Sequence, residues 1–507
     1  MGERPDAGHA LTMNNTRSRK DVGAKFTRRS LLLGSAVAGS AAVVSRTLFT
    51  SAAAEALAPF LAPAGGKTVT ADLEIAERMT ALPCFNGKSL PLWSFAEGAG
   101  FPVIRMKLGD TLDAHVKNAL PRAGEHVTIH WHGLRVANAS DGVPYVTQTP
   151  IQPGGEGRYT FVPPDTGTYF FHTHCNTVDH FGRGLIGALI VEGDEVQKSD
   201  HEIVAMMKDW HIAADGGFAP FTSDDGAAKA GTAGRLRSIN GEARPAFKVP
   251  AAANVRLRLL NVDPVRISEI GIEGAEAAII AVDGNACVPI SLLTWRFGPA
   301  QRLDILMRSP KTGKSARLVD YFAPEPVVLA DFVSEGPAAR KDTFKAHALR
   351  AGRGPSPDLT SAERITLDFS ATATGAAVSA AGEAGLEVGA LCLSKRSFWA
   401  INKQAWASVD HKDLGPPLAT LQRGKSYIIE LKNLTSHAHP IHLHGHTFEV
   451  LSSNLRKLPP HRADTVLLVP KERVEVAFVA DNPGRWMLHC HILEHQETGM
   501  MGYISVT

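Results

Sequence analysis

Apolar and polar residues alternate over short stretches along most of this chain, and long stretches with an apolar residue every three or four positions are scarce. The short stretches are rich in β-branched and aromatic residues, and Gly, Pro, Asn and Asp separate them. Clear examples are HVTIHWHGL (126–134), TYFFHTH (168–174), NVRLRLLNV (254–262), SYIIELKNL (426–434) and RVEVAFVA (473–480). This pattern is typical of many short strands joined by turns. The sequence therefore predicts an all-β protein built from sandwiches or barrels.

The chain also repeats itself. FVPPDTGTYFFHTH (161–174) matches FVADNPGRWMLHCH (478–491) in a phenylalanine, a glycine, an aromatic residue and two histidines. IHWHG (129–133) likewise matches IHLHG (441–445). Two distant parts of the chain are therefore expected to fold alike.

A strand that ends in asparagine precedes each of these matched parts, at Asn118 and at Asn433. A third such strand ends at Asn261, and no histidine pair follows it. One unit is therefore expected three times, with chemistry in the outer two only. The seams are expected near 194–198 and within the Gly/Ala/Ser-rich stretch 350–386, which is typical of a linker.

Length and charge narrow the classes of protein. The chain has 507 residues, of which 44% are hydrophobic, and a formal net charge of +2. Domains usually have about 100–200 residues, so about three are expected. The even balance of acids and bases gives no concentrated basic face, which argues against a nucleic-acid partner.

The first residues are typical of a targeting segment. Arg28 and Arg29 precede the apolar run 31–44, and the alanines at 52–54 offer a small-residue cleavage site. The run is shorter than the ~20 residues that a membrane span needs. Paired arginines before such a run indicate a twin-arginine signal, so we expect export to the periplasm by the twin-arginine machinery.

Five cysteines are scattered through the chain: Cys84, Cys175, Cys287, Cys392 and Cys490. An odd number at wide spacing does not make a disulfide scaffold. Cys490 stands between two histidines and is expected to bind a metal. The other four are expected to be buried small apolar residues, and any pairing among them stays open.

Four His-x-His pairs carry the strongest signal: His130/His132, His172/His174, His442/His444 and His489/His491. Residues i and i+2 of a strand face the same side, so each pair presents two imidazoles together. If the outer units pack face to face, eight imidazoles converge, which is too many for one ion. Neutral imidazole suits copper, zinc, iron or nickel. A zinc hydrolase normally uses one such pair with carboxylates and would leave the rest unused.

Cys490 must point away from the cluster, because its two neighbours point toward it. A second site behind the strand would then combine Cys490 with His439, His495 and Met500. Cysteine, two histidines and a weak methionine are the ligands of a blue-copper electron-transfer centre. Three coppers in the cluster and one feeder store four electrons, the number that reduces dioxygen to two waters.

With these motifs the chain resembles the multicopper oxidases of the laccase-like type with three cupredoxin domains. The residues that carry the resemblance read HWHG (130–133), HTHC (172–175), HPIHLHGH (439–446) and HCHILEHQETGMM (489–501). It covers about residues 67 to 507. It implies three cupredoxin-like Greek-key β-barrel or sandwich domains, with an export signal and leader at 1–54 and domains at 67–196, 197–350 (without copper motifs) and 351–507 (with a linker at its start).

The resemblance also assigns four coppers. It places the type 1 copper on His439, Cys490, His495 and Met500. It gives His130 and His442 to the type 2 copper, and it gives His132, His172, His174, His444, His489 and His491 to the type 3 pair. Asp141 matches an acid that in the family lies close to the cluster and helps supply protons, which water formation consumes.

The electron donor stays open. A methionine axial ligand implies a moderate potential, so we expect easily oxidised phenols, anilines or dye-like donors, which need an open cleft over His439 or His495. The chain has ten methionines but no cluster beyond Met206–Met207 and Met500–Met501, which argues against a methionine-rich cover for cuprous ions. The alternatives are a cuprous-ion oxidase in copper tolerance, a non-catalytic exported copper-binding protein, and a copper nitrite reductase, which would not need the paired histidines.

Overall fold

A computed structural model of the chain describes residues 66–98, 100–193, 195, 198–352, 354–372, 397–406 and 414–507. The export signal expected at 1–54, Cys392 and residues 353 and 373–386 of the linker-like stretch 350–386 lie outside them. Nearly all regular structure is strand, which confirms the all-β prediction. The helices are short: η1 (Pro83–Phe85), η2 (Asn138–Ser140), α2 (Thr177–Arg183), α3 (Asp224–Ala227) and α5 (Leu493–Glu497). None of the described helices has the length and apolar character needed to span a membrane.

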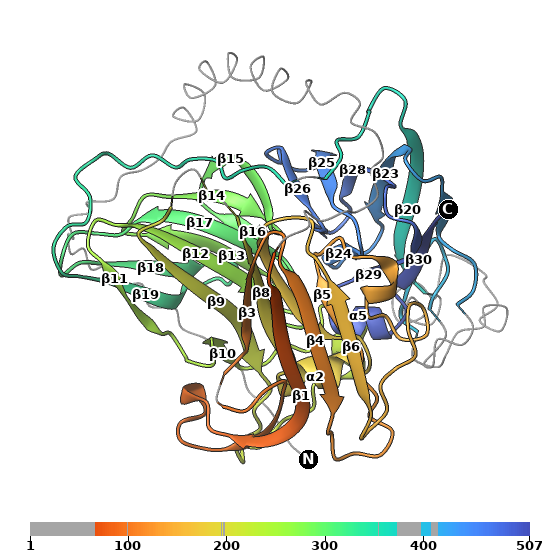
Figure 1. Ribbon diagram of the computed structural model, residues 1–507, viewed down its shortest axis with the longest axis horizontal. Helices are drawn as coiled ribbons and strands as arrows, with labels where there is room; N and C mark the ends of the chain where they lie inside the picture. The colour runs from red at the N-terminus through yellow and green to blue at the C-terminus, as the bar shows by residue number, and fades with distance from the viewer. Residues whose placement is uncertain are drawn as a thin grey trace, which may run out of the picture. The chain divides into compact units, whose positions relative to one another are not determined.

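The strands fall into three groups in chain order, each made of two sheets (Figure 1). The first group, orange to yellow, has one sheet in the order β2 (Leu90–Ser94), β1 (Thr68–Thr80), β4 (Thr111–Asn118), β6 (Glu156–Phe161). Its second sheet has the order β3 (Val103–Lys107), β8 (Ile186–Glu192), β7 (Gly167–Thr173), β5 (Ile129–His132).

The middle group, green in Figure 1, follows the same plan. One sheet has the order β10 (Leu236–Ile239), β9 (His201–Trp210), β12 (Asn254–Asn261), β17 (Arg302–Arg308), β14 (Ala277–Val282), β15 (Asn285–Ser291). The other has the order β11 (Ala246–Pro250), β19 (Val327–Glu335), β18 (Ser315–Asp320), β13 (Ser268–Glu273), β16 (Trp295–Phe297).

The last group, teal to blue, again has two sheets. The first has the order β21 (Trp399–Ile401), β20 (Glu363–Ala371), β23 (Ser426–Asn433), β28 (Arg473–Val479), β25 (Phe448–Ser453), β26 (His461–Ala463). The second has the order β22 (Ala419–Leu421), β30 (Met501–Val506), β29 (Gly484–Cys490), β24 (His439–Leu443), β27 (Thr465–Leu468).

The asparagine at the end of a strand marks the same place in all three groups. The strands that end at Asn118, Asn261 and Asn433 each run parallel to the first strand of a sheet, β1, β9 or β20. Each asparagine donates from Nδ2 to backbone carbonyls, and its Oδ1 accepts from the backbone N–H two residues on. The side chain thus satisfies groups that the strand leaves open where the chain turns away. The exact domain boundaries stay a prediction.

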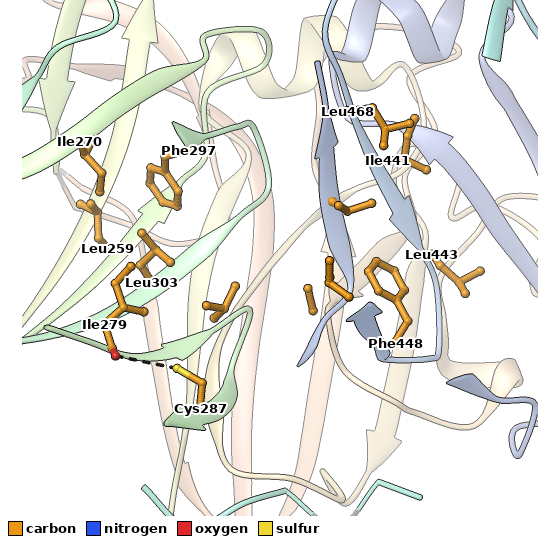
Figure 2. Packing of buried hydrophobic residues seen from close by; sticks show 14 of the residues in the cluster. Leu259, Ile270, Ile279, Cys287, Phe297, Leu303, Ile441, Leu443, Phe448 and Leu468 are labelled. Atoms are coloured by element: carbon orange, nitrogen blue, oxygen red, sulfur yellow. Dashed lines mark hydrogen bonds between the residues drawn. The ribbon is translucent and has the colours of Figure 1, made fainter. Parts of the chain in front are cut away.

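Alternating apolar residues face inward between the two sheets of each group. One buried cluster fills the first group, and a second runs continuously through the middle and last groups. Figure 2 shows part of the second, with Leu259 and Phe297 of the middle group and Ile441 and Phe448 of the last. A shared core of this kind fixes the two groups against each other.

Three cysteines are packing residues, as expected. Cys84, Cys175 and Cys287 are buried and free. Figure 2 shows Cys287 among aliphatic side chains, with its Sγ 3.8 Å from the carbonyl oxygen of Ile279.

Candidate copper centres

The four histidine pairs lie on, or at the end of, four strands of the outer groups. β5 pairs with β7 so that His130 lies opposite His172, and β24 pairs with β29 so that His442 lies opposite His489. Because i and i+2 project to the same side, each outer group presents four imidazoles on one patch.

These two patches meet. The rings of His130 and His444 stack with their centroids 3.8 Å apart, and those of His132 and His442 stack at 3.7 Å. All eight rings are buried. The eight imidazoles therefore converge in the structure, as the sequence predicted.

The ring nitrogens gather in sets of three. Within each set, one nitrogen per residue lies within 4.8 Å of the others. The sets are His130, His132 and His442; His132, His172 and His491; and His174, His444 and His489. His132 belongs to two of these sets, which indicates that the ions held there would lie next to one another.

Backbone carbonyls fix the protonation of four of these rings. A carbonyl oxygen can only accept, so the Nδ1 that contacts it carries the hydrogen. These contacts join His130 to Asp141 O (2.9 Å), His172 to Thr173 O (2.8 Å), His442 to Asp464 O (3.0 Å) and His489 to Cys490 O (3.0 Å). The opposite nitrogen, Nε2, then carries a lone pair, which lies 3.0 Å from Nε2 of His444 in the case of His489.

Several of the cluster's nitrogens are buried without a hydrogen-bond partner among the described residues. They are Nε2 of His130, His172, His174 and His442, Nδ1 of His132, and both nitrogens of His491. Buried polar atoms without partners are rare, and so many in one place fit a site for metal ions.

The pKa values agree with ligand chemistry. Burial, followed by the neighbouring imidazoles, lowers the pKa of His489 to about 3 and holds those of His172, His174 and His491 well below the usual value. The rings are therefore neutral at physiological pH, which is the form that binds metal. An all-imidazole donor set of this size suits copper.

Asp141 touches a cluster histidine from each outer group. Its Oδ2 lies 2.9 Å from Nδ1 of His444, and its backbone oxygen accepts from His130. The next residue, Gly142, has φ +75°, and a Cβ there would meet the oxygen of Ile129 at 1.7 Å. Only glycine therefore allows the chain to turn so closely and hold the carboxylate against the cluster.

A second buried carboxylate, Asp464, was not identified from the sequence. Its Oδ1 lies 3.3 Å from Nε2 of His132 and 3.2 Å from Nδ1 of His442. Arg302 of the middle group binds both of its oxygens, at 2.9 and 2.5 Å. Burial tends to raise the pKa of Asp464, but Arg302 outweighs it and holds the pKa well below its usual range. Asp464 is therefore a fixed negative charge behind two cluster histidines.

Asp283 completes this buried arrangement. Its Oδ1 accepts from the backbone N–H of Arg302 at 2.8 Å, and its Oδ2 accepts from that of Thr465 at 3.1 Å. Burial, and then repulsion from Asp464, raises the pKa of Asp283 to about 7. One guanidinium thus lies between two carboxylates, and the whole set is inaccessible to solvent.

One sequence signal does relate to this arrangement. The glycine of HWHG, Gly133, has φ +86°, and a Cβ there would meet Nη2 of Arg302 at 2.2 Å and Oδ2 of Asp464 at 2.6 Å. A glycine directly after a His-x-His pair therefore marks a close approach by another part of the chain. It does not say which part.

The second predicted site lies on the other side of β29. Nδ1 of His439 and Nδ1 of His495 are 3.0 Å apart, and each is 3.6 Å from Sγ of Cys490. The centre of a triangle with these edges lies about 2 Å from each corner, which is the length of metal bonds to His and Cys. The three atoms therefore fit one ion.

The outer nitrogens of the two rings are already bonded. Nε2 of His495 donates to the carbonyl oxygen of Lys229 at 2.8 Å, and Nε2 of His439 contacts Oγ1 of Thr435 at 2.8 Å. His495 therefore directs a lone pair at its partner ring across 3.0 Å. A cation between the two nitrogens makes this approach favourable.

Cys490 needs such a cation as well. Burial raises the pKa of its thiol above the usual value, so burial alone would keep it protonated. A bound metal ion reverses this by holding the thiolate. The backbone of Met500 is hydrogen-bonded to both Cys490 and His495, and its side chain is buried. Its role as axial ligand stays a prediction.

Among the described residues, no open cleft of the kind that phenols would need lies over this site. His439 and His495 are both fully buried, and their outer nitrogens are occupied by Thr435 and Lys229. Thr435 belongs to the last group, whereas Lys229 belongs to the middle group, a contribution that the sequence did not indicate.

Comparisons with known proteins agree with this geometry. Three domain models described as multicopper oxidase match residues 81–196, 201–316 and 394–507. The multicopper oxidase MmcO of Mycobacterium tuberculosis is 26% identical over 94% of this chain and 96% of its own length. Laccase-1 of Botryotinia fuckeliana is 26% identical over 82% of this chain and 78% of its own.

Solved structures give the same result. The multi-copper oxidase of Pseudomonas thermotolerans is 36% identical, with a TM-score of 0.76 over 87% of this chain and all of that one. A multicopper oxidase of Campylobacter jejuni described as a metallo-oxidase is 25% identical, with a TM-score of 0.71 over 88% of this chain and 96% of that one.

The fold and the two sites define a copper-dependent oxidoreductase that uses dioxygen as its electron acceptor. The chain belongs to the multicopper oxidase family, whose standard complement is four coppers: one type 1, one type 2 and two type 3.

Proposed function

We propose that this protein is a laccase-like oxidase in which Cys490 receives electrons one at a time and passes them to the eight-histidine cluster. The type 1 copper would be held by His439, Cys490 and His495, with Met500 as axial ligand. The type 2 copper would be held by His130 and His442, and the type 3 pair by the other six cluster histidines, His132, His172, His174, His444, His489 and His491. Bound copper would supply one-electron redox chemistry at the first site and dioxygen reduction at the second.

A single observation carries this proposal: one strand, β29, serves both sites. The ligand atom of Cys490 lies on one side, and the rings of His489 and His491 lie on the other. His489 also donates from Nδ1 to the carbonyl oxygen of Cys490 at 3.0 Å. The two sites are therefore joined by covalent bonds and by one hydrogen bond.

Asp141 is the candidate for proton supply. Its Oδ2 contacts Nδ1 of His444, and its buried Oδ1 lies 3.2 Å from Nδ1 of His130. A carboxylate so placed can hold a proton at Oδ1 and release it where water forms, which is the role of a general acid.

The donor class in this proposal is small and easily oxidised: phenols, anilines or dye-like molecules. The laccase among the relatives supports organic donors. A second candidate is a metal ion such as Cu⁺, because both type 1 histidines are buried and one similar structure is described as a metallo-oxidase. An ion that gives up its electron at a distance needs no contact with a ring.

Copper content, spectrum and oxygen uptake test this function together. Protein purified with copper should hold four ions per chain and absorb strongly near about 600 nm, where copper–thiolate charge transfer falls. Oxygen uptake should then be measured with a substituted phenol and with Cu⁺. Zinc, or a single copper, would overturn the oxidase. Turnover with Cu⁺ alone would move the donor to the metal-ion class.

We also propose that the protein is exported to the periplasm by the twin-arginine machinery. The support is the sequence at Arg28, Arg29 and the apolar run 31–44. A reporter fused to residues 1–54 should be exported, and replacing both arginines by lysine should retain it in the cytoplasm. Export of the lysine variant at the original level would contradict this route.

A further inference from the structure

A short segment of the middle group, Thr222–Thr232, lies over the Cys490 site. We call this segment the cover. It includes α3, and the carbonyl oxygen of its Lys229 accepts the hydrogen bond from Nε2 of His495 at 2.8 Å. The outer face of the cover is exposed at Asp225 and Lys229, which pair with each other at the surface. The cover therefore separates His495 from solvent by one layer of chain.

Glu494 holds the two ends of the cover. It is buried, and it precedes His495 on α5. Its Oε1 accepts from the hydroxyls of Thr222 and Thr232, each at 2.8 Å, and from the backbone N–H of Ser223 at 3.2 Å. Its Oε2 accepts from the backbone N–H of Thr232. One carboxylate thus makes four hydrogen bonds to the cover, of the charge-assisted kind that is stronger than a neutral bond.

Trp399 anchors the middle of the cover. Its indole N–H donates to the carbonyl oxygen of Ala227 at 2.7 Å. Its ring packs on His495 and His439, with centroids 4.6 and 5.1 Å apart. The cover, the tryptophan and the two ligand rings therefore form one packed unit.

A glycine seats the far end of the cover closely. Gly231 has φ +88°, and a Cβ there would meet Val265 at 2.6 Å and Ile492 at 3.2 Å. Both the conformation and the space therefore require glycine. The cover therefore packs closely against the site, and side chains hold it at both ends and in the middle.

We propose that the cover determines which donors the enzyme oxidises and that Glu494 is the positioning residue that keeps it closed. This rests on the function proposed above. With the cover closed, a phenol cannot reach the ring of His495. Donors then give up their electron through the Lys229 peptide and its hydrogen bond to His495, which favours compact donors, including metal ions. Phenols that need contact with the ring are oxidised only when the cover opens.

The stoichiometry is the same for both classes of donor. A metal ion gives up one electron, and a phenol gives up one electron and releases one proton to solvent. Four such oxidations, with four protons, convert one dioxygen to two waters. The cover therefore changes the rate at which electrons enter and leaves the overall reaction unchanged.

Two variants open the cover in different ways. Glu494→Gln removes the negative charge from the anchor. The double variant Thr222→Val with Thr232→Val keeps Glu494 and removes two of its donors. Glu497→Gln is the matched control, because it makes the same change on the same helix but its carboxylate accepts from Val178 in the first group.

Hydrogen–deuterium exchange of the copper-free proteins tests closure without any activity. Peptides that cover 222–232 should exchange about tenfold faster in both opening variants than in the wild type and in Glu497→Gln, because charge-assisted hydrogen bonds are lost. Unchanged protection in both opening variants would show that Glu494 does not hold the cover.

Steady-state kinetics of the copper-loaded proteins test selectivity. The ratio of kcat/KM for a substituted phenol to that for ferrocyanide should rise about tenfold or more in both opening variants, as the accessible population grows. Absorption near about 600 nm and copper content should stay at wild-type values. Equal changes for both donors would overturn the proposal. Absence of oxygen uptake with every donor in the wild type would instead refute the proposed function, and the exchange experiment would still report on the cover.

Discussion

The outer groups of strands and the middle group contribute to the two sites in different ways. The outer groups supply every residue assigned as a copper ligand. The middle group supplies none, yet its Arg302 binds Asp464 behind the histidine cluster and its segment 222–232 lies over His495. A repeat that lacks the metal motifs therefore still contributes to both sites, to one through a buried charge and to the other through a hydrogen bond to a ligand ring.

The largest effect should come from an outer-group ligand. Cys490→Ser removes the thiolate that joins the two sites. Absorption near about 600 nm should disappear with the thiolate. Dioxygen uptake with a phenol should fall by more than about a thousandfold, because the residue that would pass electrons to the cluster is lost; each factor of ten corresponds to about 1.4 kcal/mol of barrier. Visible spectra and an oxygen electrode measure both. The control is Cys287→Ser, at a buried cysteine of the middle group, and this variant should keep the absorption near about 600 nm.

A change in the middle group should come next. Arg302→Met leaves the buried carboxylate of Asp464 without its partner, which should lower the free energy of unfolding by about 3–5 kcal/mol. Asp464 would then no longer be held in place beside His132 and His442, so copper affinity at the cluster should fall by about 10- to 100-fold. Urea denaturation and copper titration measure the two. Arg302→Lys should restore part of the stability. If a folded Arg302→Met protein bound copper with wild-type affinity, Arg302 would have no effect on copper binding at the cluster.

A smaller effect is expected at Asp141. Asp141→Asn keeps the size of the side chain but cannot supply a proton, so kcat should fall by about a hundredfold. Copper content and absorption near about 600 nm should remain, because the Cys490 site is untouched. An unchanged kcat across the pH range would remove Asp141 from the proton supply.

The smallest effect concerns pH. Burial, opposed by the hydrogen bond to the backbone of His444, lowers the pKa of His446 to about 4, while an unfolded chain has a value of about 6.5. Between these values the unfolded chain binds a proton that the folded one does not, so stability falls as the pH drops below 6.5. From pH 8 to pH 6 the loss from this one group should be about 1 kcal/mol. Denaturation of the copper-free protein should show it, and His446→Phe should flatten the slope.

The local part of the site followed from local rules. Four His-x-His pairs in alternating stretches predicted strands with paired imidazoles, and Cys490 between two histidines predicted opposite-facing sites. Both are found, because the period of a strand does not depend on its neighbours. The sequence repeat likewise predicted that the metal motifs lie in the first and last groups only.

The contacts between groups did not follow. Asp464 meets Arg302, and Glu494 meets Thr222 and Thr232, across more than a hundred residues of chain. Only Glu494 stands in a motif, HCHILEHQETGMM, and nothing in that motif indicates its partners. A lone carboxylate between two strands or in a short helix has no distinctive spacing. The hydrogen bond from His495 to Lys229 could not be predicted for the same reason, since Lys229 belongs to another group.

By itself the sequence determined the strands, the threefold repeat and the side to which each ligand points, since these depend on periods of two and on turn residues. Only the tertiary structure decided which buried charges stand behind the cluster and which segment shields His495. Such contacts depend on how separate groups pack, and packing brings together residues whose distance along the chain carries no signal.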